Sequence, residues 1–149
     1  MSDGLPVERL SSHAVIVGFG LPGRSAADAL RAAGVPFCVV ELNPGTVQRA
    51  GHAGVPIVEG HAADEGALRR AGIERAAMLV LAVPDEPAVL AAIPVARRLN
   101  PTVRIIARCA FTSAGMEAVR RGADAIVVAE QVVATAIAAA VGKPTADAR

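Results

Sequence analysis

The sequence of 149 residues is poor in aromatic side chains: it has no Trp and no Tyr, and its three phenylalanines are Phe19, Phe37 and Phe111. Proteins that bind single-stranded nucleic acid stack its bases on aromatic rings, so this class is excluded. Fifteen Lys and Arg residues balance 14 Asp and Glu residues, which gives a net charge of +1. Binding to duplex DNA needs a basic surface, so we expect no nucleic-acid partner.

Cysteines and long hydrophobic runs are also scarce. Two Cys residues cannot make a disulfide framework or a four-ligand zinc site, and they favour a reducing compartment. The longest apolar runs, Ala76–Pro84 and Val132–Val141, fall short of the about 20 residues that cross a bilayer. Met1–Ser12 lacks the basic start and apolar core of a signal peptide. We therefore expect a cytoplasmic protein.

Apolar residues make up 53% of the chain and charged residues 19%, which is typical of a globular domain. Short apolar runs alternate with segments rich in Ala, Leu and Arg, and several runs are apolar on successive residues, as in strands covered on both faces. The predicted strands are Ala14–Gly18, Phe37–Glu41, Val55–Gly60, Met78–Val83, Val103–Arg108 and Ala125–Val128. This rhythm predicts an α/β fold, a Rossmann-like doubly wound parallel six-stranded sheet in three α/β/α layers.

Helix boundaries are marked by capping residues and by glycines that follow the last turn. The helices predicted on this basis are Pro22–Ala33, Asp64–Ala71 and Thr112–Arg121. No linker, repeat or low-complexity block interrupts the chain, which predicts a single domain over residues 13–141. We expect flexible tails at residues 1–12 and 142–149.

The segment Gly18-Phe19-Gly20-Leu21-Pro22-Gly23 matches the motif G-x-G-x-x-G between a predicted strand and a predicted helix, the context in which it indicates a nucleotide site. Gly18 would allow the tight turn, Gly20 the close approach of a phosphate, and Gly23 close packing of helix and strand. Amides at the start of the helix would face the phosphates. The alternative is a degenerate domain that keeps the turn and binds nothing.

Glu41 ends the second predicted strand, 18 residues after Gly23. A carboxylate there can accept both ribose hydroxyls of an adenosine and would repel a 2′-phosphate, so NADP is disfavoured. The alternative is a solvated carboxylate at the end of a strand. Asn43, two residues later, is expected to cap the second helix.

Two more polar residues fall at the carboxyl ends of predicted strands, the edge where such sheets bind ligands. His61 can contact an adenine or a phosphate, or it is an exposed loop residue. Arg108 can reach a phosphate, or it forms a structural ion pair. Cys38 and Cys109 are expected to be small buried residues, since no base stands beside either.

No catalytic constellation is visible: the sequence has no Ser/His/Asp arrangement, no Tyr-x-x-x-Lys motif and no set of metal ligands. Asp85 and Glu86 are expected to be first-turn acids of the fourth helix. A nucleotide site without reaction machinery indicates a sensor and not an enzyme.

The segment Val89–Ala96 is apolar on every side, whereas a surface helix needs only one apolar stripe. Its outer face is a candidate contact for a second subunit, although alanine also makes both faces look apolar. Pro94 is expected to kink this helix. The last helix, Gln131–Val141, would fold back on the sheet or dock on a partner.

The order of motifs from His13 to Val141 resembles the nucleotide-binding RCK (TrkA-N) domain, and most closely the cytosolic domains of Kef-type cation:proton antiporters. The stretches that carry the resemblance are Ile16–Gly23, Val40-Glu41, Gly60–Asp64, Leu68–Ile73, Asn100-Pro101, Ile105–Arg108 and Gly122–Asp124. Leu21 stands where members often have a basic residue, and Arg24 is the nearest candidate to replace it.

The resemblance implies a regulatory domain at the inner face of a membrane that binds AMP, ADP, ATP, NAD or NADH and controls a potassium or cation channel, transporter or antiporter. It implies homodimers or larger rings, often through the fourth and fifth helices. The residues it places around the nucleotide are Gly18, Phe19, Gly20, Leu21, Pro22, Gly23, Glu41, Leu42, Gly60, His61, Ala62, Val83 and Arg108. Two alternatives stay open: a small NAD-dependent oxidoreductase, and a Rossmann module used only for dimerisation.

Overall fold

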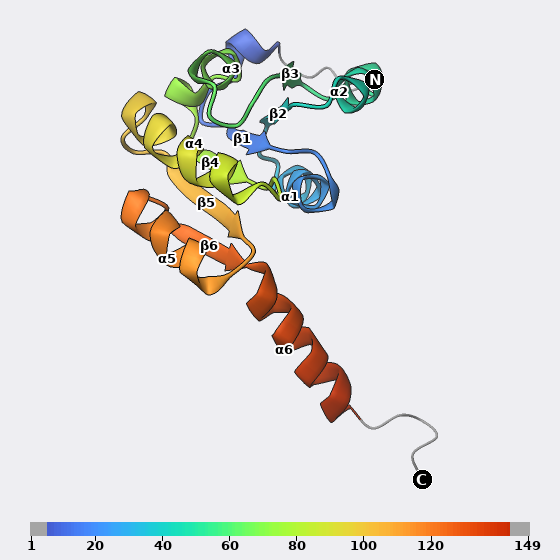
Figure 1. Cartoon of the computed structure of the whole chain (residues 1–149). Coiled ribbons are helices and arrows are strands. Elements are labelled where there is room, and N and C mark those ends of the chain that lie inside the picture. The colour runs from blue at the N-terminus through green and yellow to red at the C-terminus, as the bar shows by residue number, and fades with distance from the viewer. Residues whose placement is uncertain (1–5, 144–149) are drawn as a thin grey trace.

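The computed structural model describes residues 6–143, which form one parallel sheet of six strands in the order β3-β2-β1-β4-β5-β6 (Figure 1). The strands are β1 (Ala14–Val17), β2 (Phe37–Glu41), β3 (Ile57–Glu59), β4 (Met78–Leu81), β5 (Arg104–Cys109) and β6 (Ala125–Val128). The predicted Rossmann-like α/β fold is confirmed. The bounds predicted for β2 and β6 are those observed, and the others differ by one or two residues at an end.

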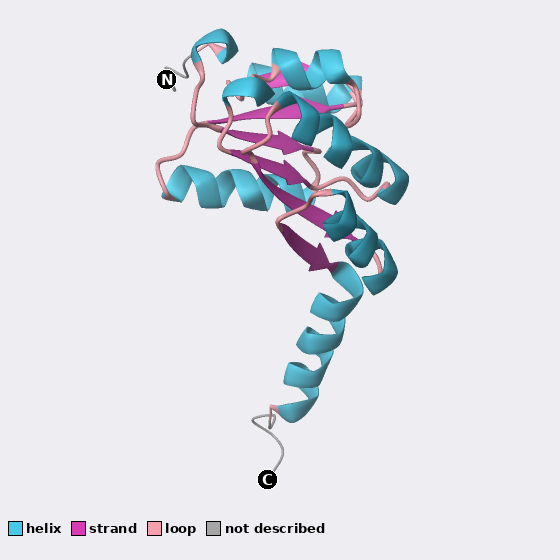
Figure 2. Cartoon of the chain, turned by 90° about the vertical axis from the view of Figure 1, so that its left-hand side faces the viewer, coloured by secondary structure: helices cyan, strands magenta, loops and turns pink. Residues whose placement is uncertain are grey.

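Helices cover both faces of the sheet (Figure 2). They are α1 (Leu21–Ala32), α2 (Pro44–His52), α3 (Glu65–Arg70), α4 (Glu86–Leu99), α5 (Thr112–Arg121) and α6 (Ala129–Gly142). In β1, Val15 and Val17 belong to the core shared with α3, α4 and α5, whereas Ala14 and Ile16 pack with Ala27 of α1 on the other face. All four residues of β1 are buried, which explains why this strand is apolar on successive residues.

Several helices begin or end at the residues that were predicted to mark their boundaries. Asn43 caps α2, since its Oδ1 accepts hydrogen bonds from the amides of Gly45 and Thr46 at 2.9 and 3.2 Å. Asp64 caps α3 by accepting from the amide of Gly66. Gly122 ends α5 with a φ of +118°, a backbone conformation that residues with a Cβ rarely adopt.

The apolar segment Val89–Ala96 lies within α4, which runs through Pro94 as one helix. Most of this segment faces the chain's own core; its buried residues are Val89, Ala92, Ile93 and Ala96. Ala91 and Pro94 are exposed, so the outward surface is small. Contact of this segment with a second copy of the chain remains a prediction.

The last helix, α6, does not fold back on the sheet: it follows β6 without an intervening residue and projects away from the domain (Figure 1). None of its residues is buried. The helices α1 and α2 cover one face of the sheet, over β1–β3. On that same face, no helix of residues 6–143 covers β4–β6 (Figure 2). No helix in that range is long and apolar enough to cross a membrane.

Part of the expected N-terminal tail is ordered against the domain. Val7–Arg9 form a 3₁₀ turn, Leu10 is buried, and Arg75 Nε donates a hydrogen bond to the carbonyl of Leu10 at 2.9 Å. The remainder of the two expected tails, residues 1–5 and 144–149, lies outside the described residues.

Candidate nucleotide-binding site

The glycine-rich turn joins β1 to α1 at the carboxyl edge of the sheet. Gly18 has a φ of +94°, and a Cβ there would lie 2.7 Å from Cγ1 of Val83. Gly23 is buried, and a Cβ on it would run into the carbonyl of Gly18. A Cβ on Gly20, by contrast, would meet no atom within 4 Å. The turn is therefore closely packed beneath Gly18 and Gly23 and open to solvent at Gly20.

The first turn of α1 has no capping side chain within residues 6–143: its N-cap is Gly20, and no side chain in that range bonds to it. The helices α2, α3 and α4 each begin with an Asn or Asp whose side chain accepts an amide. The helices α5 and α6, like α1, have no capping side chain among the described residues. Just before α5, Glu86 Oε1 accepts from the amides of Ala110 and Phe111.

Pro22 has no amide proton, and the amide of Arg24 bonds to the carbonyl of Gly20. The amides of Leu21 and Gly23 are therefore the ones that the first turn of α1 can offer to an anion, and the helix dipole favours one there.

Glu41 lies at the carboxyl end of β2, beside this turn. Its Oε2 accepts a hydrogen bond from the amide of Phe19 at 3.3 Å, and the residue is half-buried. This contact holds the carboxylate against the turn, whereas the alternative interpretation expected it to be free in solvent. A carboxylate has about four acceptor positions, so capacity remains for two ribose hydroxyls.

Two adjoining cavities meet at Glu41, Val83 and Pro84. The first, of about 410 Å³, is lined by Val17, Val40, Glu41, Leu42, Asn43, Pro44, Gly60, His61, Ala62, Val83, Pro84, Asp85 and Ala88. The second, of about 370 Å³, is lined by Gly18, Phe19, Gly20, Leu21, Pro22, Glu41, Ala82, Val83, Pro84 and Arg108. Together they form a cleft at the point between β1 and β4 where the strand order reverses, as expected for ligand sites in such sheets.

Twelve of the thirteen residues predicted to surround a nucleotide line this cleft, and Gly23 lies buried beneath the turn. Among the residues that follow β4, Ala82, Pro84 and Ala88 line the cleft without having been predicted, and Asp85 was expected only in the first turn of the helix. The available signal was position: these residues follow β4, which is the neighbour of β1 in the sheet. Whether these residues contact a ligand remains a prediction.

His61 and Arg108 lie at opposite ends of the cleft. His61 is exposed, and its Nδ1 accepts a hydrogen bond from the amide of Ala63 at 3.1 Å, which leaves Nε2 without a hydrogen-bond partner in residues 6–143. Arg108 is half-buried and has no ion pair or side-chain hydrogen bond with any residue in 6–143. The structural ion pair considered for Arg108 is thus absent from the described part of the chain.

Among the described residues, the cleft holds no cluster of nucleophiles, bases or metal ligands. Burial raises the pKa of Cys38 to about 12, and burial is also the main cause that raises the pKa of Cys109. Both thiols are buried, as expected. Within the described range, no group of three or more His, Cys, Asp or Glu side chains could hold a metal ion. The arrangement can bind an anionic ligand, and its described residues form no nucleophile–base pair.

The strand order, the open glycine-rich turn and the acidic residue at the end of β2 define a Rossmann-type domain. The chain belongs to the TrkA-N domain family, whose model matches residues 14–129. It is 32% identical over 130 residues to the Escherichia coli (strain K12) protein YbaL, named as a cation/proton antiporter. It is 30% identical over 125 residues to KefB of Alkalimonas amylolytica, named as a K⁺ efflux antiporter.

These matches cover 87% and 84% of the chain but only 23% and 19% of the two relatives, so the chain spans about a fifth of their length. Among solved structures, the TrkA-N domain of inner membrane protein YbaL from Escherichia coli superposes with a TM-score of 0.85 at 29% identity, over 89% of this chain and 98% of that one.

Two structures that contain nucleotides share the fold. The AMP-bound Kef C-terminal domain of Shewanella denitrificans matches 88% of this chain and 82% of its own, with a TM-score of 0.73 at 22% identity. GsuK bound to ADP matches 89% of this chain and 34% of its own, with a TM-score of 0.74 at 24% identity.

Proposed function

We propose that this chain is a regulatory domain that binds an adenine nucleotide (AMP, ADP, ATP, NAD or NADH) and controls a potassium or cation channel, transporter or antiporter. The observation that carries the proposal is the uncapped start of α1 beside Glu41, because it offers amides to phosphates and a carboxylate to a ribose within one cleft. The nucleotides in the two distant structures support the ligand class.

In the proposed complex, the phosphates lie over Gly20 and the ribose hydroxyls bond to Glu41. The adenine occupies the cavity beside Leu42 and His61, and Arg108 approaches the phosphates from β5. Glu41 would disfavour NADP, because its charge repels a 2′-phosphate. Residues on both halves of the sheet would then hold one ligand, so binding would stabilise one arrangement of the domain and shift its population.

The membrane partner would respond to the arrangement that the nucleotide stabilises. The two relatives are named as antiporters and extend well beyond the matched segment. This supports a transporter as the membrane partner of the domain. We accordingly infer that the domain works in the cytoplasm at the inner face of a membrane.

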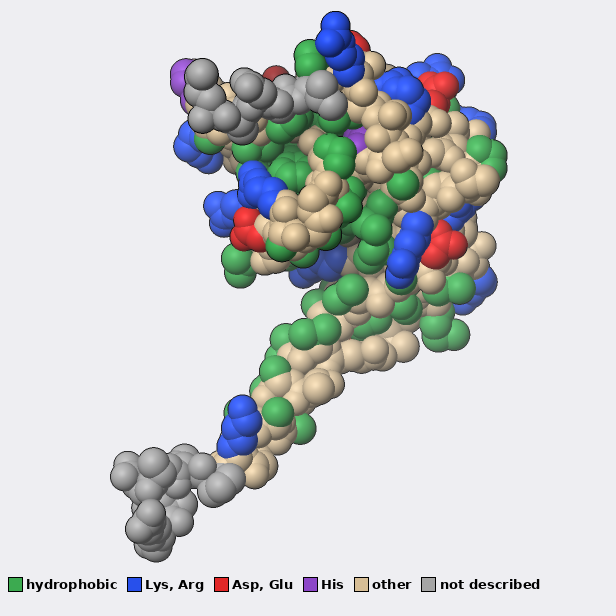
Figure 3. All heavy atoms as spheres, turned by 180° about the vertical axis from the view of Figure 1, so that it is seen from behind, with side chains coloured by type: hydrophobic (Ala, Val, Ile, Leu, Met, Phe, Trp, Pro, Cys, Tyr) green, Lys and Arg blue, Asp and Glu red, His purple; other side chains and the backbone are tan. Residues whose placement is uncertain are grey.

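A second copy of the chain is also proposed as a partner. The surface of α6 is largely hydrophobic (Figure 3). Its large exposed hydrophobic side chains are Val132, Val133, Ile137 and Val141, with 54%, 55%, 59% and 81% of their surface accessible. An isolated helix of this length is marginal in water. The uncovered face of β4–β6 carries Met78, Val80, Ile106 and Val127 together with Arg104 and Arg108. Exchange of α6 between two copies would cover the apolar part of this face and the apolar side of α6.

The test is thermal unfolding, followed by far-ultraviolet circular dichroism because Trp and Tyr are absent. AMP, ADP, ATP, NAD, NADH and NADP are added separately; a ligand at 100 times its Kd adds about 2.7 kcal/mol, which is several degrees of Tm at this size. We expect an adenine nucleotide to raise Tm, and Glu41→Ala to remove the rise.

Glu59→Ala is the matched control, since Glu59 pairs in register with Glu41 on the neighbouring strand and lies outside the lining of the cleft. The control should keep the rise. No rise with any nucleotide would contradict the proposal and favour the dimerisation module. Turnover of NADH with a small carbonyl compound would favour the oxidoreductase.

A further inference from the structure

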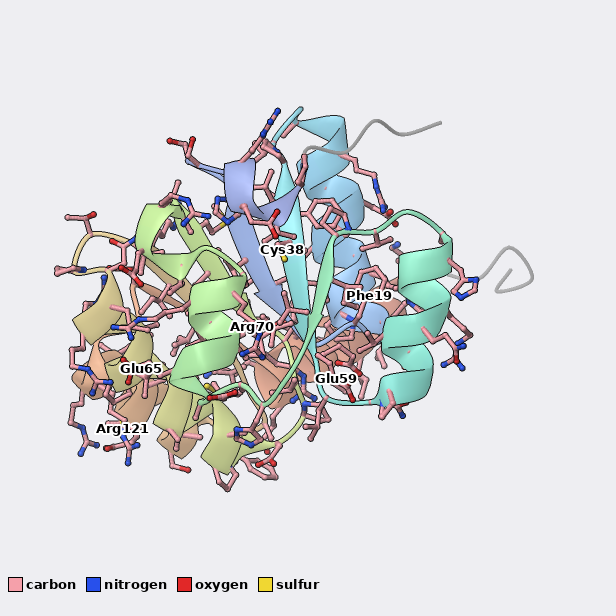
Figure 4. The ribbon with its side chains drawn as sticks, turned by 90° about the horizontal axis from the view of Figure 1, so that it is seen from above. Phe19, Cys38, Glu59, Glu65, Arg70 and Arg121 are labelled. Atoms are coloured by element: carbon pink, nitrogen blue, oxygen red, sulfur yellow. The ribbon has the colours of Figure 1, made fainter. Side chains whose placement is uncertain are left out.

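A third cavity, of about 480 Å³, opens beside the glycine-rich turn but outside the nucleotide cleft. It is lined by Phe19, Gly20, Arg24, Thr46, Arg49 and Ala50. Phe19 lies between α1 and α2 (Figure 4), and its ring packs with the core on that face of the sheet. The cavity shares Phe19 and Gly20 with the phosphate end of the cleft, so the two spaces are neighbours.

The polar side chains of this cavity are two arginines and a threonine, with no carboxylate among the lining residues. Arg49 donates to Thr46 Oγ1 at 3.3 Å. The Arg24 side chain has no hydrogen bond or ion pair within residues 6–143. Other exposed arginines do hold carboxylates: Arg31 bonds to Asp28, and Arg98 to Glu65.

The nearest acids are engaged elsewhere. Glu41 accepts the amide of Phe19 and lines the cleft, not this cavity. Asp28, one turn along α1, is paired with Arg31. Within residues 6–143, two guanidinium groups without a paired carboxylate therefore line one cavity, together with a hydroxyl whose proton is free to be donated.

We propose that Arg24, Thr46 and Arg49 form a second anion site that binds a phosphate dianion. Planar guanidinium groups bond to phosphate oxygens in pairs, and two of them match the charge of a dianion. The phosphate comes from one of two sources: free inorganic phosphate, or the 2′-phosphate of a ribose in the neighbouring cleft. The second source requires that the charges of Arg24 and Arg49 outweigh the repulsion of a 2′-phosphate by Glu41. Only the second source rests on the proposed nucleotide binding.

The experiment measures Tm with AMP at saturation, so that the glycine-rich turn is occupied. Inorganic phosphate is titrated to 20 mM against potassium chloride at about the same ionic strength, which removes general screening. We expect phosphate to raise Tm by several degrees. In the double variant Arg24→Gln/Arg49→Gln, loss of two charge-assisted contacts should raise the apparent Kd for phosphate at least about tenfold.

Arg104→Gln is the matched control, because Arg104 is exposed and also lacks a side-chain hydrogen bond in the described chain, but lies at the amino end of β5. It should respond to phosphate like the wild type. An equal response in the double variant, or no response of the wild type to phosphate or to a 2′-phosphate, would overturn the proposal.

NADP and NAD distinguish the two sources. If NADP stabilises the wild type more than NAD does, and the double variant removes the difference, the site takes a ribose 2′-phosphate. If only free phosphate acts, the site is independent of the dinucleotide. Nucleotide binding that fails in every form of the chain would contradict the proposed function, and the phosphate titration without AMP would still decide for or against the second site.

Discussion

Arg121 Nη1 donates a hydrogen bond to the carbonyl of Leu90, 3.1 Å away, in the neighbouring helix. Leu90 is four residues before Pro94, which has no amide proton to donate to that carbonyl. Arg121 of α5 thus replaces the helical hydrogen bond that α4 lacks. The contact explains how Pro94 is accommodated inside α4, and it joins two helices that pack side by side on the sheet.

The replacement predicts non-additive mutations at these positions. Pro94→Ala restores the missing amide and should raise the free energy of unfolding by about 1–3 kcal/mol. Arg121→Ala should lower it by about 1 kcal/mol in the wild type, and by clearly less in the Pro94→Ala background. Urea unfolding of the four proteins measures the coupling. Arg120→Ala is the control, because both arginines pair with Glu117 of α5 but only Arg121 reaches the carbonyl of Leu90. Additive effects of Arg121→Ala and Pro94→Ala would contradict the interpretation.

Two glycines of the turn should respond in opposite ways to one methyl group. Gly23→Ala brings its Cβ against the carbonyl of Gly18 and should destabilise the fold by about 2 kcal/mol or more. Gly20→Ala meets no protein atom within 4 Å and should leave Tm of the free protein nearly unchanged while weakening nucleotide binding. Thermal unfolding with and without ligand separates the two effects; a large loss of Tm in free Gly20→Ala would contradict this.

Stability should fall in mildly acidic solution because of His13. Burial is the main cause that lowers the pKa of this side chain below 6.5; its Nε2 bonds to the carbonyl of Ala71 at 2.8 Å, and its buried Nδ1 has no partner. The unfolded chain therefore takes up a proton below pH 6.5 that the folded chain does not, and stability decreases as pH falls below that value.

The measurement is urea unfolding between pH 7.5 and 5. His13→Gln keeps an N–H donor and should flatten the dependence, whereas His52→Gln, at an exposed histidine, should leave it unchanged. Equal slopes in the wild type and His13→Gln would exclude His13 as the cause.

The two cysteines should be inert in the native protein. A pKa of about 12 at Cys38 lowers the thiolate fraction by about three orders of magnitude relative to an ordinary thiol, and both side chains are at most 1% exposed. A disulfide reagent at pH 8 should label neither thiol in the native state and both in urea. Rapid native labelling would show that the buried strands open readily.

The dimer proposal predicts that a charge on α6 separates the copies without unfolding them. Ile137 is 59% exposed in the single chain, so Ile137→Asp should change monomer stability by no more than about 0.5 kcal/mol. Light scattering should give a dimer for the wild type and a monomer for the variant. Val119→Asp, at an exposed residue of α5, should stay dimeric; a monomeric Val119→Asp would place the interface on α5 instead.

Local patterns were sufficient to predict the strands, the glycine-rich turn and the cap at Asn43, because each depends on neighbours in the sequence. They were also sufficient to bring Glu41 and Arg108 to one edge, since parallel strands end together. They could not predict that Arg24 and Arg49 line one cavity. The two residues lie on different helices and come together only because α1 and α2 pack on one face of the sheet. Nor could they predict that Arg121 donates a hydrogen bond to the carbonyl of Leu90, because the two residues are 31 positions apart in the sequence.

The absence of any residue between β6 and α6 has a mechanical consequence. A helix of 14 residues is about 21 Å long. Since its base continues directly from a strand, no flexible joint absorbs a tilt of that strand. A rotation of about 5° at β6 would carry the far end of α6 through about 2 Å, so a small adjustment in the sheet is amplified with distance along this lever.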